Sequence, residues 1–197
     1  MKEVNHRWCK SMFSLSSFDV SAKKPPEAKK VDGRGQARNL KPADLELICS
    51  SFKDEKWVVV FGLAYLTGSR ISEICSMEVD QIKEHDILIK ISKLKDGRVE
   101  YRRMDRDDQI NDFLSMYEIP ETGYVFPGRK PGTHIGRKAA DEALRAACEV
   151  AEIDGVSTHS FRRSLATNLI KDAGWTIQQV QRYLGHKNIN NTLKYFG

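Results

Sequence analysis

Five residues of this sequence could together carry out phosphoryl transfer, although they lie in separate stretches of the chain. They are Arg70, His159, Arg162, His186 and Tyr195. Two guanidinium groups can neutralise the charge that a phosphate diester gains as it reacts, a task that two Mg²⁺ ions perform in other enzymes. A histidine can move a proton near neutral pH, and a tyrosine oxygen can serve as a covalent nucleophile. The set needs neither a metal nor a cofactor for this chemistry.

Each of these residues has a simpler interpretation when it is taken alone. Arg70 could be a surface arginine beside a turn, and Tyr195 could be a packing aromatic. His159 and Arg162 are three residues apart, which puts them on one face of a helix, but such pairs are common. A protonated His186 would be favoured at a helix C-terminus by the helix dipole alone. The chemical interpretation therefore depends on the residues occurring together.

The hydropathy pattern predicts a mainly α-helical protein with one small antiparallel β-sheet, an α+β class. Isoleucines recur at every second position from 87 to 91, and Asp96-Gly97 is a strong hairpin signal. Strands are therefore expected over 86–95 and 98–104. Residues 55–66 are apolar nearly all round, which is typical of a buried helix. Further helices are expected from Pro42, from about Arg70, and over 105–117, 136–152, 161–173, 177–184 and 189–196.

Three sequence boxes together resemble the tyrosine recombinase family, which includes phage integrases and Xer-type dimer resolvases. They occur in the family's order, and the resemblance covers about residues 40–196. The boxes are Thr67-Gly68-x-Arg70-x-x-Glu73, His159-x-Phe161-Arg162-Arg163-Ser164-x-Ala166-Thr167, and Leu184-Gly185-His186 with Tyr195 nine residues later. The resemblance implies a site-specific DNA recombinase or integrase catalytic domain, acting in DNA integration or excision for a phage or another mobile genetic element.

The resemblance also implies a role for each candidate residue. Tyr195 attacks the scissile DNA phosphate and forms a 3′-phosphotyrosyl link, which leaves a free 5′-hydroxyl. Arg70 and Arg162 hold the non-bridging oxygens, and His186 adds a hydrogen bond there. His159 acts on the tyrosine proton. The bond energy stays in the phosphotyrosyl link, so rejoining the DNA needs neither ATP nor a metal.

The family also uses a lysine on a β-hairpin as the general acid for the leaving 5′-oxygen. Lys93 and Lys95 fall on the same face of the expected strand, so alternation cannot separate them. Lys93 is preferred because Ser92-Lys93 fits the family's sequence better, and Lys95 is the alternative. Glu73 matches an acidic position that supports the site, although an ordinary helix salt bridge explains it equally well. The residues expected to contact DNA are Arg70, Arg162, Arg163 and Lys95.

The formal net charge of +5 is concentrated at the start of the chain. Residues 1–41 hold ten Lys/Arg and four Asp/Glu, whereas residues 42–197 hold 22 and 23. Residues 1–41 are therefore expected to form a short helix and a basic linker, and residues 42–197 the catalytic DNA breaking-rejoining domain. Whole recombinases of this family carry a core-binding domain before the catalytic domain and a tail after the tyrosine, so a shortened form is expected here.

The expected partner is double-stranded DNA, on which the full-length protein would form a homo-tetramer with accessory DNA-bending proteins. No metal site is expected, because the four cysteines and five histidines lack the spacing of metal ligands. No run approaches the roughly 18 apolar residues of a membrane span, and the first residues lack the apolar part of a secretory signal. A cytoplasmic, nucleoid-associated protein without membrane contact is expected.

Three other functions fit part of the sequence. A type IB topoisomerase-like enzyme shares the phosphotyrosine chemistry, but the Leu184-Gly185-His186 box and the nearby Tyr195 favour a recombinase. A catalytically silent DNA-binding regulator would not need the full set of candidate catalytic residues. A plain helical domain with a basic arm would show no salt-sensitive DNA binding.

Overall fold

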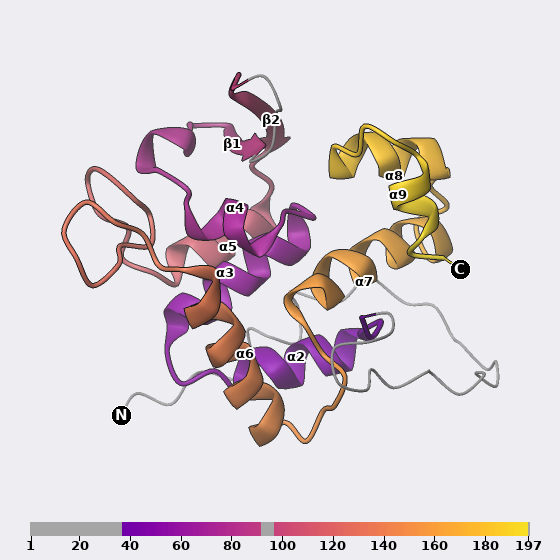
Figure 1. The fold of residues 1–197 in the computed structure, drawn as a ribbon, viewed down its shortest axis with the longest axis horizontal. Helices are drawn as coiled ribbons and strands as arrows, with labels where there is room; N and C mark the ends of the chain where they lie inside the picture. Colours follow the sequence, from indigo (N-terminus) through magenta and orange to yellow (C-terminus); the bar gives the residue numbers. More distant parts are fainter. Residues whose placement is uncertain (1–36, 92–96, 197) are drawn as a thin grey trace.

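The computed structural model describes residues 37–91 and 97–196, which form a mainly helical protein with one two-stranded antiparallel sheet (Figure 1). This arrangement confirms the fold class predicted from the sequence. The elements are α2 (Pro42–Ser50), α3 (Glu55–Leu66), α4 (Ile71–Cys75), the 3₁₀ helix η1 (Val79–Gln81), β1 (Asp86–Ile91), β2 (Glu100–Asp105), α5 (Asp108–Ser115), α6 (Arg137–Val150), α7 (Thr158–Lys171), α8 (Ile177–Leu184) and α9 (Asn190–Leu193).

Helix α3 is the centre of the core and packs against α2, α4, α5 and α7. Every residue from Val58 to Tyr65 is buried, as expected for a helix that is apolar nearly all round. The ring of Phe61 stacks on Phe52 with 5.1 Å between centroids and lies 4.9 Å from the ring of Phe161 in α7. The core therefore holds α7 at the turn that carries Arg162.

Gly62 leaves room for a ring of α5 against α3. A Cβ atom at Gly62 would lie 2.2 Å from Cε1 of Phe113, a side chain that is 1% exposed. Gly62→Ala should lower the free energy of unfolding by about 1–3 kcal/mol, because overpacking outweighs the helix propensity that alanine gains. Urea unfolding would measure the loss, and Phe113→Leu in the same chain should restore part of it. Gly136→Ala is the control, since its Cβ would meet nothing within 4 Å; an equal loss there would contradict this packing.

Helix α7 begins three residues before the start that the apolar pattern predicts. Its first residue is Thr158, because the hydroxyl of Ser160 accepts a hydrogen bond from the backbone N–H of Ser157 at 3.0 Å. Such a side-chain bond satisfies one backbone donor at the end of the helix. The earlier start puts His159 in the first turn of α7, one turn before Arg162.

Helix α8 has the bounds that the sequence predicts. Thr176 caps its start by accepting the backbone N–H of Gln179 at 3.3 Å, and Gly185 ends it in the left-handed conformation with φ of 68°. Figure 1 shows α8 and α9 in yellow beside α7 and away from α2 and α6. The chain reversal at Gly185 brings His186 back to α7, where it contacts Arg162.

The β-hairpin confirms the predicted pairing but with different ends. Asp86 lies opposite Asp105, and Ile91 lies opposite Glu100. β2 extends to Asp105, so α5 begins at Asp108 and not at the predicted residue 105. The predicted end of the first strand falls within residues 92–96, outside the described residues. The predicted N-terminal helix and most of the linker, over residues 1–36, also fall outside them.

Candidate active site

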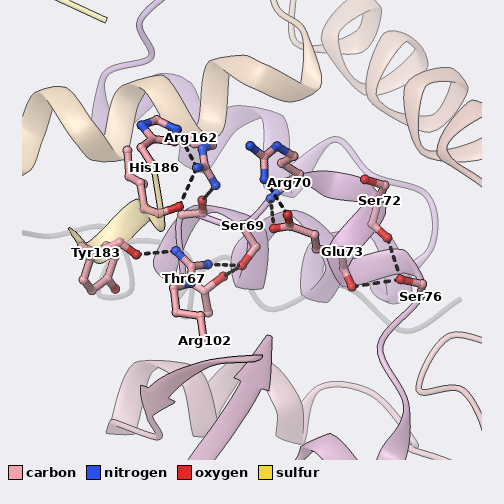
Figure 2. A network of polar contacts seen from close by, with 12 residues as sticks. Thr67, Ser69, Arg70, Ser72, Glu73, Ser76, Arg102, Arg162, Tyr183 and His186 are labelled. Carbon is pink, nitrogen blue, oxygen red and sulfur yellow. Dashed lines mark hydrogen bonds and ion pairs between the residues drawn. The ribbon is translucent and has the colours of Figure 1, made fainter. Parts of the chain in front are cut away.

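Arg162 of α7 is the centre of a polar network that joins three parts of the chain (Figure 2). Its side chain is almost fully buried, with only 2% exposed. Nη1 donates to the backbone carbonyl of Gly68, and Nη2 donates to the carbonyl of Leu184 at 2.7 Å and lies 2.8 Å from Nε2 of His186. The three boxes of the sequence, far apart along the chain, therefore meet at one guanidinium group.

The guanidinium of Arg162 loses its hydration but has partners that keep it charged. Burial lowers the pKa of Arg162, and the positive charge of Arg70 lowers it further, whereas Tyr195 and Glu73 raise it. An arginine starts from a pKa above about 12, so the group stays protonated at neutral pH. A fixed, desolvated cation of this kind is a preorganised ligand for a phosphate.

His186 is 9% exposed and is held through both ring nitrogens. A guanidinium can only donate, so Nε2 accepts the hydrogen bond from Arg162, and the ring proton on Nδ1 is donated to Oγ1 of Thr192 at 2.8 Å. Burial lowers the pKa of His186 to about 4, and the positive charges of three nearby arginines contribute to the same shift. The interpretation of His186 as a cation at a helix end is therefore wrong, because the ring is neutral at pH 7.

Protonation of His186 should destabilise the folded chain. The pKa of His186 is about 4 in the folded state, against 6.5 as its ordinary value, so the unfolded chain binds the extra proton between these values. The free energy of unfolding should then fall as the pH drops from about 6.5 toward 4, by at most about 1.4 kcal/mol per pH unit. Urea unfolding across this range would show a steeper loss for the wild type than for His186→Gln, which keeps an acceptor for Arg162. Equal losses in the two proteins would contradict the neutral ring.

Arg70 stands directly before α4, and a buried carboxylate fixes its side chain. Nη1 of Arg70 lies 2.7 Å from Oε1 of Glu73, and Oε2 accepts the backbone N–H of Arg70 at 2.8 Å. Glu73 is 4% exposed, whereas 42% of the Arg70 side chain is exposed. Arg70 is thus held from one side and open to a ligand on the other. The ion pair of Glu73 is therefore present and is made with the candidate site arginine, while a supporting role of Glu73 in the reaction stays a prediction.

Gly68 lets the Thr67–Arg70 turn approach the end of α8. Its φ is 59°, and a Cβ at this position would lie 2.5 Å from Cδ2 of Leu184. Within the turn, the hydroxyl oxygens of Thr67 and Ser69 are 2.7 Å apart and hydrogen-bonded. The sequence therefore needs glycine at 68 for the close contact that brings Arg70 toward the C-terminal helices.

The candidate nucleophile Tyr195 lies beside Arg162 and His186. Its side chain is half-buried and lies near enough to Arg162 to raise the pKa of that guanidinium, and its ring centroid is 5.8 Å from that of His186. Its backbone N–H donates to the carbonyl of Thr192 at 3.0 Å. His159 is exposed in the first turn of α7 and lines, with residues of α6, an open cavity of about 830 Å³. Arg70, His186 and Tyr195 thus gather around Arg162, and His159 lies one turn away on the same helix.

The remaining predicted residues either lie outside the described residues or make other contacts. Lys93 and Lys95 belong to residues 92–96, which lie outside the described residues. Arg163 is half-buried and donates through Nη1 to the backbone carbonyl of Ala37 at 2.9 Å. This bond joins the segment before α2 to α7, so a role of Arg163 at DNA stays a prediction.

Sequence reasoning missed Arg102, a third arginine beside the site (Figure 2). From β2, its Nη2 donates to Oγ of Ser69 at 2.8 Å and its Nη1 donates to the backbone carbonyl of Tyr183. Burial lowers the pKa of Arg102 to about 10, and the charge of Arg162 contributes to this. One signal was available in the sequence: strand alternation puts Arg102 on the same face as the buried Met104.

The described residues contain neither a cluster of metal ligands nor a membrane-spanning helix. Over 37–91 and 97–196, no group of three or more His, Cys, Asp or Glu side chains could hold a metal ion. Within the same ranges, no helix combines the length and the apolar composition that crossing a membrane requires. The positive charge of the site is supplied by Arg70, Arg102 and Arg162.

Comparisons with known proteins point to one family. The model of the Phage integrase family matches residues 39–196. The tyrosine recombinase XerC of Corynebacterium efficiens is 28% identical over 145 residues, which are 69% of this chain and 44% of that protein. The tyrosine recombinase of Thermosipho africanus is 30% identical over 134 residues, which are 68% of this chain and 46% of that protein. Among solved structures, the XerA recombinase aligns with a TM-score of 0.66 at 17% identity, over 81% of this chain and 60% of that chain.

These likenesses agree with the fold. The chain spans about half the length of the first curated relatives that it matches. The solved structure shares the fold at low sequence identity. Since the family match extends over residues 39–196, most of the 197 residues, this chain belongs to the phage integrase family of tyrosine recombinases.

Proposed function

We propose that this chain is the catalytic part of a site-specific DNA recombinase, which cleaves and rejoins double-stranded DNA through a 3′-phosphotyrosyl link to Tyr195. One observation carries the proposal: buried Arg162 contacts His186 and the turn before Arg70, and the ring of Tyr195 lies against that of His186. A tyrosine hydroxyl beside two guanidinium groups suits attack on a phosphate diester. Membership of the family supports the same reaction.

In the proposed step, the oxygen of Tyr195 forms a bond to phosphorus, and the bond from phosphorus to the 5′-oxygen breaks. The tyrosine proton passes to His159, and a hairpin lysine donates a proton to the leaving oxygen. Lys93 is proposed as this lysine, with Lys95 as the alternative. One phosphate ester replaces another, so the reverse reaction rejoins the DNA without ATP.

Arg70 and Arg162 are suited to hold the two non-bridging oxygens during this step. Glu73 fixes the Arg70 guanidinium at 2.7 Å while much of that side chain remains exposed to a ligand. Arg162 is fixed by backbone carbonyls on two sides. In other enzymes, one preorganised donor of this kind contributes about 2.7–4 kcal/mol to the transition state.

His186 can hydrogen-bond the phosphate only after its ring proton moves. In the free chain Nε2 accepts from Arg162, so a phosphate oxygen finds no proton on that nitrogen. A bound anion would favour either a protonated ring or the tautomer with the proton on Nε2. The proposal therefore includes a change in the protonation of His186 when DNA binds.

The proposed partners and context follow the family. The full-length recombinase would act on DNA as a homo-tetramer, with accessory DNA-bending proteins, in the cytoplasm at the nucleoid. Residues 42–197 would form the catalytic domain after the basic linker, a boundary supported by the family match from residue 39. Lys95 and Arg163 would add contacts to DNA, which Arg163 could make only by releasing the carbonyl of Ala37.

A nicked duplex that traps the covalent intermediate tests the proposal. DNA is first selected from a random pool by salt-sensitive binding to the protein, so that no recognition site is assumed. The selected DNA is rebuilt with a nick just after the cleavage position, and the short 5′-hydroxyl fragment diffuses away. We expect an adduct that survives SDS.

The other outcomes assign other functions. Binding without any adduct would indicate a catalytically silent DNA-binding regulator. Relaxation of any supercoiled plasmid, without preference for the selected sequence, would indicate a type IB topoisomerase-like enzyme. Absence of salt-sensitive binding would contradict a DNA partner altogether.

A further inference from the structure

Arg102 joins two segments that hold opposite sides of the candidate site. Its Nη2 donates to Oγ of Ser69 at 2.8 Å, and its Nη1 donates to the carbonyl of Tyr183, across separations of 33 and 81 residues (Figure 2). Ser69 comes directly before Arg70. Tyr183 lies in the last turn of α8, three residues before His186. One side chain of the β-hairpin therefore connects the turn of Arg70 to the helix end that leads to His186.

Arg102 is a third cation, partly buried and close to Arg70 and Arg162, which is electrostatically unfavourable. A structural role of its hydrogen bonds would explain why it lies there. The pKa of Arg102 falls to about 10 through burial first and through the charge of Arg162, while Glu73 opposes the shift. The group stays protonated at neutral pH and next to other positive charges. A planar guanidinium supplies two donors in a fixed geometry, which an ammonium group cannot reproduce.

Both partners of Arg102 are themselves tied to the end of α3. Oγ of Ser69 is hydrogen-bonded to Oγ1 of Thr67 at 2.7 Å, and the hydroxyl of Tyr183 donates to the carbonyl of Leu66 at 2.6 Å. Arg102 closes this ring of contacts from the side of the hairpin. The distance between the Thr67–Arg70 turn and the end of α8 is thereby fixed on one side by the end of α3 and on the other by Arg102.

We propose that Arg102 is a positioning residue that holds the Thr67–Arg70 turn and the C-terminal end of α8 in a fixed position relative to each other. This inference rests on the proposed function, because the relative position of the two segments determines whether Arg70, Arg162 and His186 can reach one phosphate. Arg102 acts through its two bridged segments and not by touching the DNA. Nothing in the three sequence boxes marks it.

Three variants test the role. Arg102→Met removes the two donors and keeps the length of the side chain, and Arg102→Lys keeps the charge without the fork. Arg103→Met is the matched control on the same strand, since the Arg103 side chain is 72% exposed and pairs with Asp86. The measurements are the single-turnover rate of adduct formation at saturating DNA, the salt dependence of DNA binding, and ¹⁵N spectra of the His186 ring in the free protein.

Arg102→Met should slow adduct formation on the order of 10- to 100-fold, the effect expected when reacting groups shift by about 1 Å. DNA affinity and its salt dependence should stay at the wild-type values, and Arg102→Lys should fall between wild type and Arg102→Met. The ¹⁵N signals of His186 should move in both Arg102 variants, because its contact with Arg162 is disturbed. Arg103→Met should leave all three measurements unchanged.

Two outcomes would overturn the positioning role. The first is a wild-type rate with unchanged His186 signals in Arg102→Met. The second is weaker DNA binding, with a salt slope reduced by about one and unchanged His186 signals, which would make Arg102 a direct phosphate contact. If Arg102→Met does not fold, Arg102→Lys decides by the same readouts. If the wild type forms no adduct, the proposed function fails, and the His186 spectra of the free Arg102 and Arg103 variants still decide the role of Arg102.

Discussion

Tyr195→Phe should abolish the covalent adduct with DNA while leaving DNA binding in place. The phenylalanine keeps the ring that packs 5.8 Å from His186 but lacks the hydroxyl that is proposed to attack phosphorus. Removing the nucleophile of a covalent mechanism lowers the rate by roughly 10⁴-fold or more. Denaturing gels of the labelled nicked duplex measure the adduct, and a native gel measures binding of the same duplex.

Tyr117→Phe is the control for this prediction. Tyr117 packs on Phe126 with 5.4 Å between ring centroids, in the part of the core that α5 and the following loop form. Loss of the Tyr117 hydroxyl should leave adduct formation at the wild-type rate. An adduct that persists in Tyr195→Phe would assign the nucleophile to another residue.

Arg162→Lys should impair both the chemistry and the stability. Lysine keeps one charge, but its single nitrogen cannot replace the two-nitrogen fork that donates to the carbonyls of Gly68 and Leu184 and to His186. A buried acceptor left without its donor costs about 1–3 kcal/mol, so the free energy of unfolding should fall by roughly 2–4 kcal/mol. Adduct formation should slow on the order of 10²–10³-fold, as when one donor to a developing charge is removed.

The two effects of Arg162→Lys are measured separately. Urea unfolding gives the change in stability, and single-turnover cleavage at saturating DNA, below the denaturation midpoint, gives the change in rate. Lys171→Met, at the exposed end of the same helix, is the control and should change neither quantity. A wild-type rate in Arg162→Lys would show that this guanidinium takes no part in the reaction. An unchanged free energy of unfolding would contradict the buried network.

The bounds of the helices that carry the site could be predicted where residues next to a helix end determine that end. α3 and α8 have the predicted bounds, because Asp54 and Thr176 cap their starts through nearby backbone N–H groups and Gly185 ends α8. The apolar pattern places the start of α7 three residues too late. The reason is the Ser157–Ser160 bond, which extends the helix by polar residues that the pattern does not count.

Arg102 and the protonation of His186 could not be predicted, since both depend on contacts between distant segments. The partners of Arg102 lie 33 and 81 residues away, and an isolated arginine in a strand is common in any sequence. The boxes predict that His186 belongs to the site. Its neutral ring follows from burial and from a guanidinium 24 residues away, which a helix-end argument does not include.

Glu73 shows what a motif adds to a local pattern. Its spacing from Arg70 predicts an ordinary ion pair one helical turn apart, and that pair is present at 2.7 Å. Only the family box relates the pair to a site, and only the structure shows that the carboxylate is buried while the guanidinium is open. The hairpin lysines, within residues 92–96, stay a prediction from the family box.

Identification of the amino acid bonded to DNA is the most direct test of the central claim. The trapped adduct would be digested with trypsin and nuclease, and mass spectrometry would locate the remaining nucleotide. We expect a 3′-phosphate bonded to Tyr195, in the tryptic peptide that follows Lys194, and a released strand with a 5′-hydroxyl that a kinase can label. A nucleotide on another residue such as Tyr183, or a link through a 5′-phosphate, would contradict it.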